Sequence, residues 1–339
     1  MSLTIEAIPE AEEVETARTV KGGRLKGLVR SRCPLCDSSH SRPETKIAGY
    51  QMDKCSDCGL VFMNPRCTVE HLEAIYTVRD EEELINLYAR IATPKVIGEY
   101  HEKLAKIERI MPGKGKLLDF ACAAGYFFEQ AQQRGWDAHG CDVGVWAGRA
   151  AAVRGLKNMH IGELDTLGFP DESFDVVYAA QVFEHLLYPL QDLKTLLRVL
   201  KPGGLLYIDV PNYRTLPIML GRDDFMLNEP PQHINYFTPA TLKKMLRDAG
   251  LQSIKIGSGG GLKWENLLGR PISSDIADAY GLTGNSAPAT RPQKPSLPSR
   301  VKSTAISVAK SIVVNPLLYG QAKVGINLTS ISIKPPKQT

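Results

Sequence analysis

The chain has 339 residues, which at roughly 100–200 residues per domain is enough for about two domains. Its 41 basic and 37 acidic side chains leave a net charge of +4, and this near balance argues against a dedicated nucleic-acid-binding protein, which is strongly basic. No apolar run reaches the ~18 residues of a membrane span, and the N-terminal stretch MSLTIEAIPEAEEVE is acidic, whereas a signal peptide begins basic. We therefore expect a cytoplasmic protein.

Composition divides the chain into segments. Residues 1–28 carry an acidic and then a basic cluster with few large apolar side chains, so we expect a mobile tail. Residues 29–68 carry two cysteine pairs, and residues 69–110 place apolar residues at helical spacing, which predicts a helical connector. Residues 111–260 and 323–336 together are predicted to form an α/β domain, and residues 261–322 are predicted to form an insertion with a linker and a helix.

The first candidate site is a C-x2-C-x18-C-x2-C motif formed by Cys33, Cys36, Cys55 and Cys58. This spacing lies within the window of four-thiolate zinc sites. Four thiolates complete a tetrahedral shell and leave no position for water, so we expect a structural zinc ribbon. Iron bound by tetrahedral sulfur and a redox-active dithiol are the alternatives.

From residue 115 onward, short apolar runs alternate with amphipathic stretches. The expected strands are 116–120, 136–141, 174–180, 205–210, 251–256 and 325–333. The expected helices are 127–134, 145–154, 190–200 and 241–249. Such alternation predicts a Rossmann-like α/β fold in which helices cover a largely parallel sheet.

A turn of small residues follows the first expected strand. The sequence DFACAAG runs from Asp119 to Gly125, and small residues let the backbone approach a ligand closely and let the next helix pack on the strand. Asp142 ends the second expected strand, 23 residues beyond Asp119. An acid at that position binds ribose hydroxyls in dinucleotide-type folds, so the two features together indicate a nucleotide-like ligand.

Three further stretches complete a recognisable pattern. They are FPDESFDVV (169–177) followed by FEHL (183–186), LKPGG (200–204) followed by YIDVPN (207–212), and QHINYFTP (232–239). With the small-residue turn, these motifs resemble the class I S-adenosylmethionine-dependent methyltransferases over about residues 112–258 and 323–335. The resemblance implies a seven-stranded sheet in the order 3-2-1-4-5-7-6 with helices on both faces, and S-adenosylmethionine as cofactor.

The resemblance also implies where the cofactor lies. The first acid and the turn would hold its methionyl part, Asp142 its ribose, and Glu163 with the backbone after it the adenine, while Gln181 would face the reacting end. The expected cofactor-binding residues are Asp119, Ala121, Ala123, Gly125, Tyr126, Asp142, Val143, Glu163, Leu164 and Gln181. Ala121 and Ala123 stand where the family usually has glycine.

Methyl transfer to a hydroxyl requires an acceptor in line with an activated methyl and a base for its proton. His233 and His185 are the candidate bases, because imidazole titrates near neutral pH and both residues follow expected strands. Glu184 is placed to orient His185. Alternatively, Glu184 and His185 start a helix or contact the adenosyl group, and His233 is a structural hydrogen-bonding residue. Quinone-type relatives have an acid where Gln181 stands, which argues against a catalytic divalent metal.

A four-cysteine ribbon before this domain resembles bacterial methyltransferases of glycan and surface-polysaccharide biosynthesis. That resemblance implies O-methylation of a sugar, a glycan intermediate or a small hydroxylated metabolite. The alternatives are an RNA methyltransferase whose ribbon contacts RNA, against which the charge and the scattered basic residues argue, and a non-catalytic zinc-ribbon adaptor.

Residues 301–318 combine basic and apolar positions. They are predicted either to make a peripheral membrane contact or to form a helix that covers the active-site mouth or a dimer partner. The sequence makes no prediction of the oligomeric state.

Overall fold

The computed structural model describes residues 17–18, 24–25, 28–47, 49–68, 81–215, 230–251, 253–259 and 327–336. Within these ranges, no helix combines the length and the apolar character needed to cross a membrane. The expected insertion, including residues 301–318, lies outside the described residues, as do most of residues 1–28.

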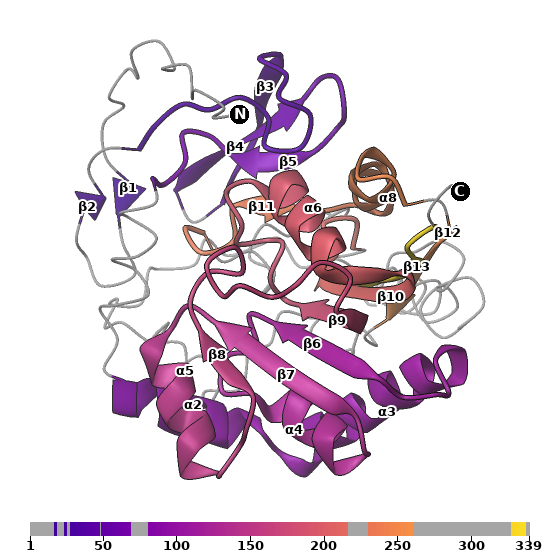
Figure 1. Cartoon of the computed structure of the whole chain (residues 1–339). Coiled ribbons are helices and arrows are strands. Elements are labelled where there is room, and N and C mark those ends of the chain that lie inside the picture. Colours follow the sequence, from indigo (N-terminus) through magenta and orange to yellow (C-terminus); the bar gives the residue numbers. More distant parts are fainter. Residues whose placement is uncertain are drawn as a thin grey trace, which may run out of the picture.

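A seven-stranded sheet forms the centre of the protein (Figure 1). In spatial order its strands are β12 (Ser253–Gly259), β13 (Asn327–Ile333), β10 (Leu200–Pro211), β9 (Phe174–Ala180), β6 (Lys116–Phe120), β7 (Asp137–Asp142) and β8 (Met159–Ile161). The five strands from β10 to β8 are parallel, and β13 runs antiparallel to both β10 and β12. This is the predicted order 3-2-1-4-5-7-6, and the fold prediction is confirmed.

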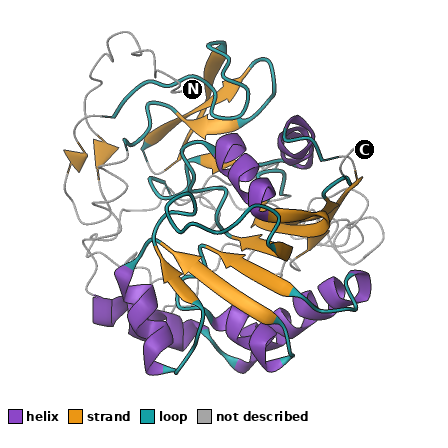
Figure 2. Cartoon of the chain, in the orientation of Figure 1, coloured by secondary structure: helices purple, strands orange, loops and turns teal. Residues whose placement is uncertain are grey.

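Helices cover both faces of this sheet (Figure 2). One layer contains α2 (Glu81–Ile91), α3 (Pro94–Ile110), α4 (Tyr126–Gln133) and α5 (Val145–Val153), and the other contains α6 (Pro189–Val199) and α8 (Pro239–Asp248). Because successive strand residues point to opposite faces, Leu117 packs with α3 and α4, whereas Leu118 packs with α6 and α8.

Local sequence explains where two of these helices begin. Thr93 caps α3 by accepting a hydrogen bond from Val96 N, and proline occupies its first turn. At α8, Thr238 and Thr241 form a reciprocal capping box. Such caps satisfy N–H groups that the first turn of a helix leaves without partners.

The N-terminal cysteine ribbon, residues 28–68 without residue 48, forms a second sheet. Its antiparallel strands are β3 (Ser41–Ile47), β4 (Tyr50–Cys55) and β5 (Val61–Met63). The fourth strand is β11 (Asn235–Tyr236), from the large domain, which pairs antiparallel with β5. A further short pair joins β1 (Ala17–Arg18) to β2 (Arg24–Leu25).

Hydrophobic cores also join the ribbon to the large domain. Leu35, Leu60 and Phe62 of the ribbon share a core with the α6 and α8 face of the main sheet. In return, Ile234 and Tyr236 lie in the core of the ribbon. The ribbon is therefore packed directly beside the segments that follow β9 and precede α8.

Candidate active site

The turn after β6 has an unusual backbone that local sequence explains only in part. Ala121, Ala123 and Gly125 have φ values of 52°, 48° and 80°, a region that costs residues with a Cβ roughly 1–2 kcal/mol. Glycine is required at position 125, since a Cβ there would lie 2.3 Å from Cε1 of Phe128. The two alanines hold the same left-handed turn at a cost in strain, and the turn leads directly into α4 at Tyr126.

Two buried acids lie beside this turn, at the carboxyl ends of neighbouring strands. Asp142 accepts hydrogen bonds from the backbone N–H of Ala123 at 2.9 Å and of Gly144 at 2.8 Å. Burial raises the pKa of Asp142, while these backbone hydrogen bonds lower it. Burial raises the pKa of Asp119 well above its usual value, and the charge of Asp142 raises it further. Each oxygen of Asp142 retains a lone pair that could accept a ribose hydroxyl.

The expected adenine side is an apolar edge next to Asp142. Val143 is 69% exposed, although it follows a buried strand. The loop after β8 joins this edge through a hydrogen bond from Gly162 N to the Asp142 carbonyl, at 2.9 Å. On that loop Glu163 is exposed and Leu164 is buried, so a flat apolar ring could lie over Val143 with Glu163 at its edge.

Gln181 belongs to a polar network that the sequence did not predict. Its φ is 57°, and it donates to Asp209 twice, from its backbone N to the carbonyl at 2.7 Å and from Nε2 to Oδ1 at 2.9 Å. Lys103 Nζ lies 3.4 Å from Asp209 Oδ2 and donates to the Tyr178 hydroxyl at 3.2 Å. The acid in the apolar run LLYIDV was the available signal for Asp209, whereas nothing in the pattern of α3 distinguishes Lys103.

The three predicted catalytic residues lie together. Glu184, His185 and His233 each have a potential ligand atom within 4.8 Å of the others, and the two imidazole rings meet edge to face with centroids 4.8 Å apart. Glu184 is 1% and His233 is 8% exposed. Glu184 and His185 lie in a turn that precedes α6, which begins at Pro189, so they do not start that helix.

The environment of His185 defines its protonation. Burial, helped by the neighbouring His233, lowers the pKa of His185 to about 3, so its imidazole is neutral at pH 7. Its Nδ1 lies 3.0 Å from the Gln232 carbonyl, which can only accept, so Nδ1 carries the proton. The lone pair is then on Nε2, which lies 3.8 Å from Glu184 Oε1.

The four cysteines of the motif converge as their spacing predicts. The Sγ atoms of Cys33 and Cys58 are 3.5 Å apart, as are those of Cys36 and Cys55, and none of the four forms a disulfide. A tetrahedral metal with bonds of about 2.3 Å to sulfur needs sulfur separations of about 3.8 Å. A hydrogen bond from Cys33 lowers the pKa of Cys58 to about 5, whereas burial raises the pKa of Cys36 to about 11. The donor set therefore fits zinc.

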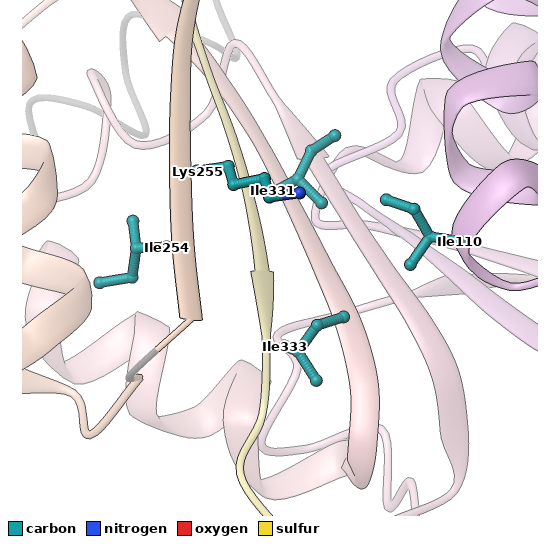
Figure 3. Close-up of a pocket in the computed structure, with 5 residues that line it drawn as sticks. All are labelled: Ile110, Ile254, Lys255, Ile331 and Ile333. Carbon is teal, nitrogen blue, oxygen red and sulfur yellow. The ribbon is translucent and has the colours of Figure 1, made fainter.

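A separate pocket of about 360 Å³ lies beside β12 and β13 of the main sheet, away from the predicted site (Figure 3). It is lined by Ile110, Ile254, Lys255, Ile331 and Ile333. Ile331 pairs with Tyr207 and Ile333 with Leu205, which places the pocket near the amino ends of the parallel strands. The predicted cofactor and catalytic residues lie at the carboxyl ends, where folds of this architecture bind their ligands.

Comparison with a model of a known protein family agrees with the fold. Residues 88–256 match the family model described as a methyltransferase domain. The chain therefore carries an S-adenosylmethionine-dependent methyltransferase domain, and it is an enzyme of that type.

Individual relatives are distant. The ubiquinone biosynthesis O-methyltransferase of Idiomarina loihiensis is 27% identical over 175 residues, which are 48% of this chain and 71% of that protein. The enzyme of the same name from Saccharophagus degradans is 25% identical over 157 residues, 43% of this chain and 66% of that protein. Among solved structures, an S-adenosylmethionine-dependent methyltransferase from Archaeoglobus fulgidus is 20% identical with a TM-score of 0.45, covering 69% of this chain and 94% of its own.

Proposed function

We propose that this methyltransferase methylates a hydroxyl group of a sugar, a glycan intermediate or another small hydroxylated metabolite. The observation that carries the proposal is the cluster of buried Glu184 and His233 with half-buried His185, which would supply a base beside the strand ends. The O-methyltransferase relatives, which act in ubiquinone biosynthesis by their names, support transfer to oxygen. The near-neutral charge supports a small acceptor over a polyanion.

S-adenosylmethionine, when bound, supplies a methyl group that its sulfonium activates for displacement. Asp119 and the turn from Ala121 to Gly125 would hold its methionyl part, and Tyr126 continues this wall into α4. Asp142 would bind the ribose hydroxyls through the lone pairs that remain free of the backbone.

The adenine would lie over Val143, with Glu163 and Leu164 at its edge. Val143 is 69% exposed, and covering its apolar surface with an apolar ring would be favourable. Gln181, held by Asp209, would lie nearest the reacting atoms.

In this proposal His233 is the base. An imidazole nitrogen of His233 would accept the proton of the acceptor hydroxyl as the hydroxyl oxygen becomes methylated. His185 stays neutral because its pKa is lowered to about 3. Together with Glu184 it would line the side of the site where the acceptor binds. Positioning and proton removal are the contributions that the protein must make.

We further propose that Cys33, Cys36, Cys55 and Cys58 hold a structural zinc ion. Four thiolates leave no open coordination position for water or substrate, so the metal would stabilise the ribbon without taking part in methyl transfer.

The proposal is tested with methyl-labelled S-adenosylmethionine and a cell extract of the source organism, followed by nuclease treatment. We expect label in nuclease-resistant glycan, lipid or small-metabolite fractions. Label released by ribonuclease would establish the RNA alternative. Failure to bind S-adenosylhomocysteine, with no transfer, would point to the adaptor.

Variants then assign the base. His233→Ala should lower transfer by about 100-fold or more, with unchanged affinity for S-adenosylhomocysteine by calorimetry. His40→Ala is the matched control, because His40 is on the ribbon with a side chain 76% exposed. Unchanged transfer by His233→Ala removes it as the base, and the same comparison with His185→Ala decides the role of His185.

A further inference from the structure

We infer that the cysteine ribbon helps to form the acceptor side of the active site. In this arrangement Arg66 of the ribbon and Asn235 of β11 act as positioning residues. They would hold two segments in a fixed position relative to each other. One segment is residues 183–187, which carry Glu184 and His185, and the other is residues 232–236, which carry His233. This inference rests on the proposed function, because it assigns these segments to the acceptor.

The first connection is Arg66, at the end of the ribbon. Its backbone exchanges two hydrogen bonds with Val29, both 2.9 Å, and these anchor the Arg66 backbone in the ribbon. Its guanidinium is buried, with the residue 8% exposed, and Nη1 donates to the Leu187 carbonyl at 2.6 Å. Its Cζ also lies 5.1 Å from the centre of the Tyr188 ring. The ribbon thereby holds the end of the 183–187 segment.

The second connection is Asn235, which lies on β11, the strand of the large domain that completes the ribbon sheet. Its backbone pairs with Phe62 of the ribbon. Its side-chain Nδ2 donates to the carbonyls of Phe183 at 3.1 Å and Leu186 at 2.7 Å. One buried amide therefore reaches both sides of the Glu184–His185 pair.

Backbone hydrogen bonds close the arrangement. The N–H groups of Ile234 and Asn235 both donate to the Glu184 carbonyl, at 2.8 and 3.0 Å, and Met63 N of the ribbon donates to the Ile234 carbonyl at 2.9 Å. The Tyr236 hydroxyl donates to the His233 carbonyl at 3.0 Å. A displacement of β5 would therefore move both imidazole-bearing segments.

Among the described residues, no comparable set of hydrogen bonds joins the ribbon to the turn after β6. The turn after β6 is held by Asp142 and by α4, and the ribbon residues named above hydrogen-bond to neither. Loosening the ribbon should therefore lower transfer while leaving cofactor affinity unchanged. Because a misplacement of about 1 Å at a reacting group costs about 100-fold in rate, the expected effect is large.

The experiment compares full-length Arg66→Met with Arg42→Met, which removes the same charge from an exposed ribbon position. For Arg66→Met we expect at least a ~10-fold loss of label transfer into the nuclease-resistant fraction of the source extract. Calorimetry should give an affinity for S-adenosylhomocysteine within about twofold of wild type, and metal analysis should give an unchanged zinc content. Arg66→Lys, which can still donate one hydrogen bond, should recover part of the transfer.

Hydrogen exchange supplies a readout that does not depend on activity. In Arg66→Met, amides of residues 183–187 and 232–236 should exchange faster, while residues 116–126 should not change. Should Arg66→Met fail to fold, Asn235→Ala is measured in the same way.

The outcomes separate the two proposals. Wild-type-like transfer by the folded variant, or unchanged exchange in both acceptor-side segments, overturns the inference. If the wild-type protein transfers no label to any fraction, the proposed function fails, and the exchange pattern still decides whether the ribbon holds these segments.

Discussion

Replacing Asp142 with alanine tests the cofactor site most directly. The two oxygens of this carboxylate accept backbone hydrogen bonds of 2.9 and 2.8 Å from Ala123 and Gly144, so the side chain is held in place before any ligand binds. Each oxygen keeps a lone pair directed away from those N–H groups. The proposed site uses these lone pairs for the ribose hydroxyls.

The size of the effect follows from the number of hydrogen bonds lost. A hydrogen bond to a charged group contributes about 1.5–3 kcal/mol. In Asp142→Ala, water can hydrogen-bond to the ribose hydroxyls in place of the carboxylate. We therefore take the lower free energy, about 1.5 kcal/mol, for each of the two hydrogen bonds lost. The sum is about 3 kcal/mol, which corresponds to an affinity roughly 100-fold weaker.

Calorimetric titration of S-adenosylhomocysteine into Asp142→Ala measures this change, with circular dichroism as the check that the fold is kept. The matched control is Asp137→Ala, at the other end of β7, where the carboxylate side chain is 50% exposed. We expect less than a twofold change in affinity for that control. An affinity of Asp142→Ala within about threefold of wild type would refute the ribose assignment.

Three further predictions concern stability and metal. The pKa of Asp119 is raised in the folded protein, so its favourable contribution is complete at low pH and is lost as the pH rises. Asp119→Asn should therefore stabilise the apoprotein against urea at pH 8. This gain should shrink toward pH 5, and a pH-independent difference would contradict it. Gly125→Ala should cost about 2–3 kcal/mol in the same assay, since φ is 80° and the new Cβ would strike Phe128; equal stability would show that the turn adapts. Cys55→Ser should lose the metal, about one zinc per chain, and lower the melting temperature, whereas Cys67→Ala should keep the metal. Retention of zinc and melting temperature by Cys55→Ser would exclude the four-thiolate site.

Much of the fold could be predicted because its signals are local. The expected strand 116–120 and helix 145–154 agree with β6 and α5 to within one residue. A buried parallel strand must be a short apolar run, and a helix on a sheet must be amphipathic. The small-residue turn was equally visible, although its left-handed backbone at Ala121 and Ala123 was not, because alanine does not require that conformation.

The candidate site was predictable only as separate pieces. Glu184 and His233 could each be placed after a strand, but their contact joins segments that are far apart in the chain. Arg66 was one of several scattered basic residues, and nothing in its neighbourhood distinguishes it from Arg42. Burial makes the difference, since Arg66 is 8% exposed and bonded to the Leu187 carbonyl.

The sequence alone indicated the alternation of strands and helices, the small-residue turn and the convergence of the four cysteines, because each is encoded by periodicity or by spacing within a short stretch, and its resemblance to a known family implied the strand order. Only the tertiary structure decided that β11 completes the ribbon sheet and that the ribbon holds the segments carrying His185 and His233. Strand pairing between distant segments depends on which backbone groups remain to be satisfied once the two cores have formed. A two-residue strand such as Asn235–Tyr236 carries no periodicity from which that partner could be read.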